Sequence, residues 1–238
     1  MPIRSIETEI DSDANMLEST NVSATQRVFN ELRQQIIEGR IAPGEKLKIE
    51  SLKVKLNTGT SPIREALSLL TSDQLVERID QRGFRAAPAS MVHFQEILAL
   101  RCQLEVLALK NSLLNGGTVW EESLILHHHR LNQESRANAE AFEKRHKAFH
   151  RALLAACDSP ILLKFCDQLY DLNIRYRFLA GKSTEYDQRD VAREHKDIVD
   201  AVLARDVEAA ASALVQHYGS TGDFLTDQLT ASLASRSC

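Results

Sequence analysis

The chain has 238 residues, which is enough for two modest domains that each bury a core of their own. Charged residues make up 26%, as in most globular proteins, and aromatic residues only 5%, while Leu and Ala recur throughout and favour helices over a β-sandwich. No apolar run reaches membrane-spanning length, and the acidic N-terminus lacks the apolar core of a signal peptide. We therefore expect a cytoplasmic protein with no membrane association.

The net charge of −4 is distributed unevenly along the chain. Residues 1–20 carry five acidic side chains against one Arg, whereas residues 21–90 carry eleven Lys and Arg against eight Asp and Glu. A basic excess confined to one segment is typical of a nucleic-acid-binding region, although a surplus of three charges decides nothing alone.

The cysteines show no C-x-x-C pair and no regular spacing; they are Cys102, Cys157, Cys166 and Cys238. Scattered cysteines are typical of reduced thiols in a cytosolic protein, and this is the interpretation we adopt. The alternative is redox sensing at Cys157 or Cys166.

Two helices joined by a glycine-containing turn are predicted in the first third of the chain. Residues 1–22 are expected to form a flexible acidic arm, and a helix over 24–38 follows from apolar residues at helical spacing. A short helix over 49–56 and a turn over 57–60 precede a second helix, which runs to about Asp73. We expect Ser61 to cap this helix, with Pro62 at its first position and Glu65 closing a capping box. This pattern outlines a helix-turn-helix.

A β-hairpin wing is predicted directly afterwards. Residues 75–79 and 84–87 form two short strands, with Arg82 and Gly83 near the tip of the turn between them. Without a side chain, Gly83 allows the backbone to approach a DNA groove closely. Arg78, Arg82 and Arg85 could contact phosphates.

The segments GRIAPGEKL, SPIREALSLL and LVERIDQRGFRAAPAS closely resemble the winged-helix domain of the GntR family, over about Ala24 to Ser90. The resemblance implies that Thr60, Ser61 and Arg64 face the major groove of double-stranded operator DNA. It also places Arg82 and Gly83 at the wing. Arg64 is the candidate for reading a guanine edge. The chain departs from the family in having Gly59-Thr60 where Ser-Arg is usual, which points to a different operator sequence. The alternative function for this domain is a winged helix that contacts proteins and not DNA.

A second domain is predicted to be an all-helical bundle. The winged domain spans 23–87, residues 88–90 form a linker and the helical domain spans 91–238. Its six expected helices cover 91–114, 119–135, 138–157, 160–180, 185–205 and 206–234. The fold class is therefore mainly α, with a small hairpin wing, and the core of the bundle is a natural place for a ligand or metal.

Four histidines are candidate metal ligands. His146 and His150 lie four residues apart on one face of a helix, and His195 and His217 lie on two later helices. Three facing helices could bring these imidazoles onto one ion, although spacing alone is a weak signal. His127, His128 and His129 point in different directions and cannot converge, so we interpret them as a solvated face.

The segments HKAFHRALLAACDSPILL and AREHKDIVDAVLARDVEAAASALVQH closely resemble the FCD ligand-binding domain, over about Val92 to His217. The resemblance implies a divalent metal held by an aspartate and three histidines. His150, His195 and His217 match the histidines, while His146 occupies the aspartate position. Four neutral imidazoles suit Zn²⁺ or Ni²⁺ better than Mg²⁺ or Mn²⁺. The alternative is a metal-free pocket in which the histidines bind the effector.

Arg101 lies in an otherwise apolar helix, where an unpaired charge would be costly. It either forms a salt bridge with Glu105 or binds the carboxylate of a small organic acid effector, which the resemblance favours. Arg175 or Arg177 could serve likewise.

The sequence therefore predicts a transcription regulator and not an enzyme. We expect a homodimeric repressor, because dimers suit palindromic operators. A zinc hydrolase-like enzyme fused to a DNA-binding head is the alternative. The chain, however, has no His-Glu-x-x-His motif, no P-loop and a single Glu-x-x-His motif at Glu143 and His146.

Overall fold

The computed structural model describes residues 23–180 and 190–236. Its internal contacts divide the chain into two compact units. The first takes the residues up to Ile36 together with Gly44–Ala87, and the second takes Ile37–Pro43 and the chain from Pro88 onward. The arm expected over 1–22 lies outside the described residues.

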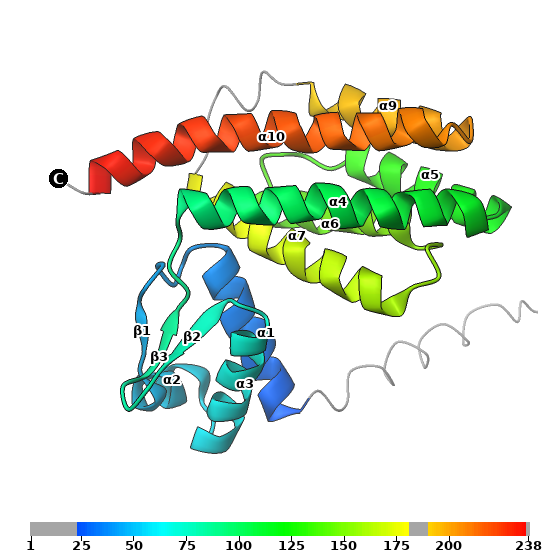
Figure 1. Cartoon of the computed structure of the whole chain (residues 1–238). Helices are drawn as coiled ribbons and strands as arrows, with labels where there is room; N and C mark the ends of the chain where they lie inside the picture. The colour runs from blue at the N-terminus through cyan, green and yellow to red at the C-terminus, as the bar shows by residue number, and fades with distance from the viewer. Residues whose placement is uncertain (1–22, 181–189, 237–238) are drawn as a thin grey trace, which may run out of the picture. The chain divides into compact units, whose positions relative to one another are not determined.

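The first unit consists of three helices and a small antiparallel sheet (Figure 1). The helices are α1 (Ala24–Ile37), α2 (Ile49–Leu56) and α3 (Thr60–Ser72); the strands are β1 (Lys46–Leu47), β2 (Val76–Ile79) and β3 (Gly83–Ala86). The sheet order is β1-β3-β2, with Arg78 opposite Phe84 in the hairpin. Leu32, Ile63 and Leu67 are fully buried between the helices, so apolar residues at helical spacing form this core as expected.

Two local features of this unit differ from the sequence prediction. Gly59, and not Ser61, is the N-cap of α3, so Ser61 lies within the first helical turn. Glu65 closes no capping box; its carboxylate instead accepts a hydrogen bond from the Thr25 hydroxyl at 2.7 Å. The strand β1 was not predicted, because two residues carry no alternating pattern and pair only with the distant β3.

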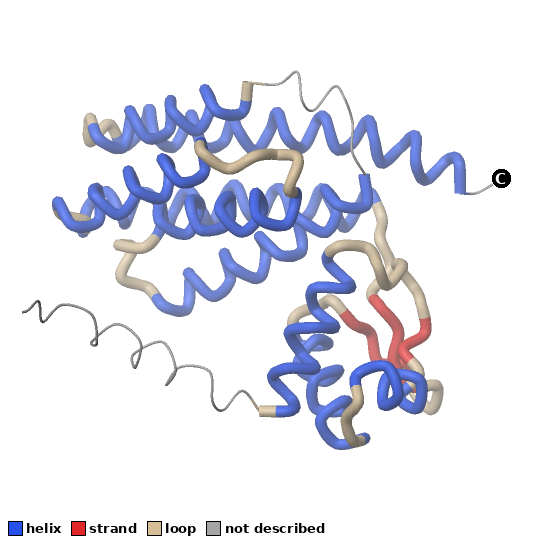
Figure 2. Tube along the Cα trace, turned by 180° about the vertical axis from the view of Figure 1, so that it is seen from behind, coloured by secondary structure: helices blue, strands red, loops and turns tan. Residues whose placement is uncertain are grey.

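The second unit is a bundle of helices (Figure 2). Its described helices are α4 (Met91–Asn115), α5 (Thr118–Asn132), α6 (Ala139–Leu154), α7 (Pro160–Ala180), α9 (Val191–Leu203) and α10 (Val207–Arg236). Leu109, Phe149, Ile198 and Leu214 are fully buried in one continuous core that α4, α6, α9 and α10 share. The mainly helical fold with an N-terminal winged helix is thus confirmed.

Capping residues fix several of these helix ends. Ser90 accepts a hydrogen bond from the His93 amide at 3.2 Å, and Asp206 accepts one from the Ala209 amide at 2.9 Å. The helix expected over 185–205 begins at Val191, with Asp190 as its cap, and its expected start lies outside the described residues. No helix in the described part of the chain is long and apolar enough to cross a membrane.

Candidate functional site

The helix α3 presents a polar face in its first turns. Ser61 and Arg64 are exposed and Thr60 is half-buried, whereas Ile63 and Leu67 anchor the opposite face in the core. A rigidly packed helix whose N-terminal side chains point outward can enter a DNA major groove.

The wing carries exposed residues at its tip. Gly83 has a φ of +88°, a left-handed conformation that suits glycine, and the Arg82 amide closes the turn on the Ile79 carbonyl at 3.0 Å. The side chain of Arg82 is exposed. Arg85 is engaged differently from our expectation: its Nε donates to Glu77 Oε2 across the hairpin at 2.7 Å, so this arginine holds the two strands together.

Four histidines from three helices meet inside the second unit. His146 and His150 come from α6, His195 from α9 and His217 from α10, and their candidate ligand nitrogens all lie within 4.8 Å of one another. All four side chains are buried. The structure therefore brings together the residues that the sequence singled out.

Hydrogen bonds fix the tautomers of two of these imidazoles. His217 Nδ1 donates to the Glu194 carboxylate at 2.7 Å. The Tyr218 hydroxyl donates to Glu105, so its oxygen accepts a hydrogen bond from His150 Nδ1 at 3.0 Å. In both rings Nε2 consequently keeps its lone pair for a metal ion.

The other two imidazoles also fit a metal. His146 Nδ1 contacts the Tyr170 hydroxyl at 2.7 Å, while its Nε2 lies 3.2 Å from His150 Nε2. His195 Nε2 is buried and has no hydrogen-bond partner among the described residues. A buried nitrogen without a partner is costly, and a cation between these nitrogens would satisfy it. The donor set therefore fits a metal ion.

The local environment favours the neutral form of three of these histidines. Burial lowers the pKa of His146, His150 and His195 well below the usual value of 6.5, and neighbouring imidazoles lower it further. Arg177 contributes to the lowering at each of the three rings. Neutral imidazole is the form that binds metals.

Arg101 lies beside this cluster and is buried with 4% of its surface exposed. Its Nε donates to Glu105 at 2.6 Å, which is the salt bridge that the sequence suggested, and its Cζ lies 5.0 Å from the ring centroid of Tyr170 and 4.3 Å from that of Tyr218. Burial alone would lower its pKa, but Glu105 and Tyr218 outweigh that effect and raise it, so the side chain stays charged.

The two other candidate arginines are placed differently. Arg177 lines a small cavity beside the cluster together with Arg101, His146 and His217, and it pairs with Glu143 at 3.0 Å. Arg175 is buried but does not line this cavity. The structure thus brings Arg101 and Arg177 to the cluster, and not Arg175.

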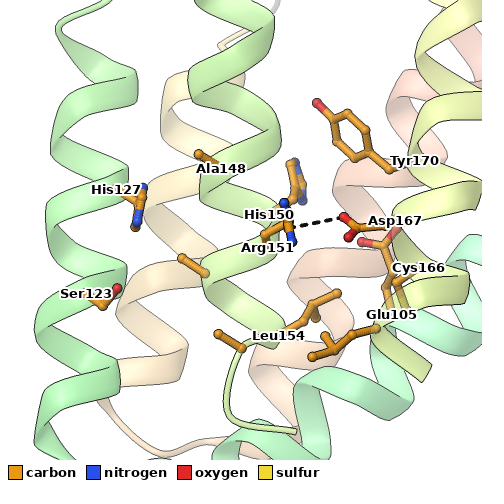
Figure 3. Close-up of a pocket in the computed structure, with 13 residues that line it drawn as sticks. Glu105, Ser123, His127, Ala148, His150, Arg151, Leu154, Cys166, Asp167 and Tyr170 are labelled. Atoms are coloured by element: carbon orange, nitrogen blue, oxygen red, sulfur yellow. Dashed lines mark ion pairs between the residues drawn. The ribbon is translucent and has the colours of Figure 1, made fainter. Parts of the chain in front are cut away.

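A larger groove of about 360 Å³ reaches the cluster along α6 and α7 (Figure 3). Glu105, His150 and Tyr170 line it together with apolar side chains such as Leu154 and Leu163. In Figure 3 an ion pair joins Arg151 to Asp167 at 3.2 Å across the gap between the two helices.

The run of three histidines on α5 does not join the metal cluster. Our interpretation of a solvated face holds only for His129, which is exposed. His127 is half-buried and lines the larger groove, and the ring of His128 lies 5.6 Å from that of Phe149.

Comparison with known proteins identifies both units. Residues 24–85 match the family described as bacterial regulatory proteins of the gntR family, and residues 96–220 match the FCD domain. The chain belongs to the GntR family. It is 36% identical over 218 residues to the HTH-type transcriptional regulator BphR of Paraburkholderia xenovorans, covering 88% of this chain and 89% of that protein.

Another relative and a solved structure agree with this assignment. The HTH-type transcriptional repressor GlaR of Escherichia coli is 33% identical over 194 residues, covering 78% of this chain and 88% of that protein. Escherichia coli McbR/YncC has the same fold, with a TM-score of 0.74 at 23% identity over 88% of this chain and all of the solved one. The GntR chain described here is therefore a DNA-binding transcription regulator with an FCD domain.

Proposed function

We propose that this GntR regulator is a repressor whose affinity for operator DNA is controlled by a small carboxylate bound beside a divalent metal. The observation that carries the proposal is the cluster of four buried histidines with the charged Arg101 next to it. A buried cation and a buried guanidinium together form a site for an anion with oxygen ligands.

Zn²⁺ or Ni²⁺ is the metal that this donor set suits best. Each of the four ligands is an imidazole, and burial lowers the pKa of His146, His150 and His195, which favours their neutral form. Tyr170, Tyr218 and Glu194 hold the rings through Nδ1, which is how partners beyond the ligands usually orient a metal site. Such a metal would supply a fixed positive charge to which an effector oxygen binds.

The proposed DNA-binding surface combines α3 with the wing. Both belong to the winged domain, which we propose spans residues 23–87. In this surface Thr60 and Ser61 bind the backbone at the groove edge, and Arg64 reads a base in the major groove. Arg82 and the backbone at Gly83 contact the neighbouring groove. GlaR is named a repressor, and its similarity supports the same role here.

We propose a homodimer because α4 carries an exposed apolar stripe. Leu100, Leu107 and Leu114 recur at intervals of seven residues and are 40%, 50% and 77% exposed. On the neighbouring α7, Phe165 is 51% exposed. We expect the purified protein to have the mass of a dimer by light scattering, and Leu107→Glu to shift it toward a monomer; an unchanged dimer would place the interface elsewhere.

The enzyme alternative would need a general base beside the metal. A catalytic zinc centre leaves one position open for water and has a free carboxylate or imidazole nearby. Around the described cluster, Glu194 binds His217 and Glu105 pairs with Arg101, whereas Glu143 pairs with Arg177 through Oε1 only and its Oε2 has no hydrogen-bond partner among the described residues. Because each of these carboxylates has a charged or imidazole partner, the arrangement favours binding over turnover.

Elemental analysis of untagged, full-length protein tests the metal. We expect about one Zn²⁺ or Ni²⁺ per chain. His195→Ala should lose the ion, because it removes a buried ligand, whereas His129→Ala should keep it, because that side chain is exposed and lies outside the cluster. Full metal content in the His195 variant would refute the site.

A further inference from the structure

Two buried N–H donors beside the histidine cluster have no acceptor. Arg101 Nη2 and Asn173 Nδ2 are both buried without a hydrogen-bond partner among the described residues. Their side chains are 4% and 5% exposed, and both line the small cavity that His146 and His217 also line. An unsatisfied buried donor costs about 1–3 kcal/mol, so two in one cavity indicate a missing acceptor.

The two donors are held next to each other. Arg101 Nη1 donates to Asn173 Oδ1 at 2.9 Å, so Nη2 and Nδ2 are the remaining nitrogens of a bonded guanidinium–amide pair. This bond also fixes the orientation of the amide, because an N–H cannot donate to the amide nitrogen. The rings of Tyr170 and Tyr218 also hold the guanidinium in place, since its Cζ lies 5.0 Å and 4.3 Å from their centroids.

The space available selects the occupant. The cavity measures about 10 Å³, which excludes a large ring. The charge of Arg101 is already balanced by Glu105, and that of Arg177 by Glu143, so attraction for an anion must come from the metal and from directed N–H bonds.

We propose that Arg101 Nη2 and Asn173 Nδ2 each bind one oxygen of the same effector carboxylate, which makes Asn173 a specificity-determining residue. The proposal rests on the effector site described above. The helices α4 and α7 each supply one donor, and the charge of the nearby metal attracts the anion. The clamp accepts a carboxylate and rejects a carboxamide, because the NH₂ group of an amide would meet one of the two donors.

Formate is the probe, because it is the smallest carboxylate, and formamide is its uncharged counterpart. We would measure the affinity of both for full-length, Zn²⁺-loaded protein by thermal shift, and the metal content of every sample. The wild type should bind formate at least about tenfold more tightly than formamide. Asn173→Asp should weaken formate binding by at least about tenfold, because the new carboxylate takes Nη2 for itself and repels the anion.

Two further variants keep the result unambiguous. Asn173→Leu removes the donor without adding charge and should also weaken formate binding while retaining the metal. Asn132→Asp makes the same chemical change on the exposed end of α5 and should bind formate as the wild type does. If the wild-type protein does not hold Zn²⁺, the metal site of the proposed function is refuted. The clamp is still tested, because formate binding by the Asn173 variants is compared with formate binding by the wild type. Formate binding that is absent in the wild type, or equal in the wild type and Asn173→Asp, overturns the clamp.

Discussion

The Cys166 thiol is buried, and burial together with the nearby Glu105 raises its pKa to about 12. At neutral pH almost no thiolate is present, and thiolate is the reactive form. We therefore expect iodoacetamide to leave Cys166 unmodified in the native protein between pH 7 and about 10, as judged by peptide mass spectrometry. The same cysteine should react readily in urea, where it regains the ordinary pKa of about 8.5. Rapid native labelling would revive the redox-sensing alternative.

Arg64 and Arg82 differ in what they are expected to read. Arg64 lies on α3, the element that we propose enters the major groove, so Arg64→Ala should cost about 1–3 kcal/mol on the operator and flatten base preference at one position. Arg82 lies in the wing turn, and Arg82→Ala should weaken binding evenly across sequences and reduce its salt dependence. Fluorescence anisotropy on operator variants measures both. Operator affinity unchanged in both variants would remove the proposed DNA surface.

Sequence spacing predicted the histidines but not their partners. A histidine pair four residues apart is visible in a helix, His195 and His217 were singled out on two later helices, and the family resemblance supported this choice. Tyr170, Tyr218 and Asn173 contact the cluster or Arg101 only because α7 and α10 pack beside α4 and α6. Nothing in the local sequence marks a tyrosine as the partner of an imidazole far along the chain. The two arginines of α7 show the same limit of sequence analysis. Arg175 and Arg177 lie two residues apart, and the sequence did not show that only Arg177 lines the cavity.

At the scale of the helices, Gly116 ends α4 where Trp120 packs against it. A Cβ at Gly116 would lie 2.2 Å from Trp120 Cε3 and 2.7 Å from the Ser112 carbonyl oxygen. Trp120 is buried and its Nε1 donates to the Ala152 carbonyl at 2.8 Å, so it cannot easily move aside. Gly116→Ala should lower the free energy of unfolding by about 1–3 kcal/mol.

Gly219 provides the matched control for this substitution. It lies within α10, and a Cβ there would meet nothing within 4 Å. Gly219→Ala should raise the free energy of unfolding by about 0.5–1 kcal/mol, because alanine favours the helix. Urea denaturation of both variants compares them directly. A Gly116→Ala protein as stable as the wild type would mean that the Trp120 contact is looser than the structure shows.

Helix interiors were predictable, whereas helix starts and short strands were not. The limits of α7 were predicted because two breaker segments, Asp158-Ser159-Pro160 and Gly181-Lys182-Ser183, flank it in the sequence. The start of α3 was misplaced because Ser61-Pro62 resembles a cap in isolation, while the backbone already turns at Gly59. The pairing of β1 with β3 depends on contacts distant in sequence, which no local pattern contains.

For the whole molecule, regulation requires that the effector bind with different affinity in the DNA-binding and released states. Arg101 is the candidate for this coupling, because one side chain contacts Glu105, Asn173 and the open cavity. Arg101→Leu would leave Glu105 buried without its cation, at a cost of about 3–5 kcal/mol. Arg101→Lys is the better variant, since it keeps a charge near Glu105 but loses the planar fork that binds carboxylates.

We expect Arg101→Lys to retain its metal and its operator affinity, and to lose most of the effect of the effector on DNA binding. The effector is first identified by a thermal-shift screen of small organic acids, and operator binding is then titrated with it. Coupling of typical size changes operator affinity about 5–150-fold, and the variant should approach no change because the differential contact is gone. Arg205→Lys is the control, because this arginine lies away from the histidine cluster and donates to the Leu113 carbonyl at 2.9 Å. It should respond to the effector as the wild type does. A normal response in Arg101→Lys would assign the coupling to Arg177, the other arginine that lines the cavity.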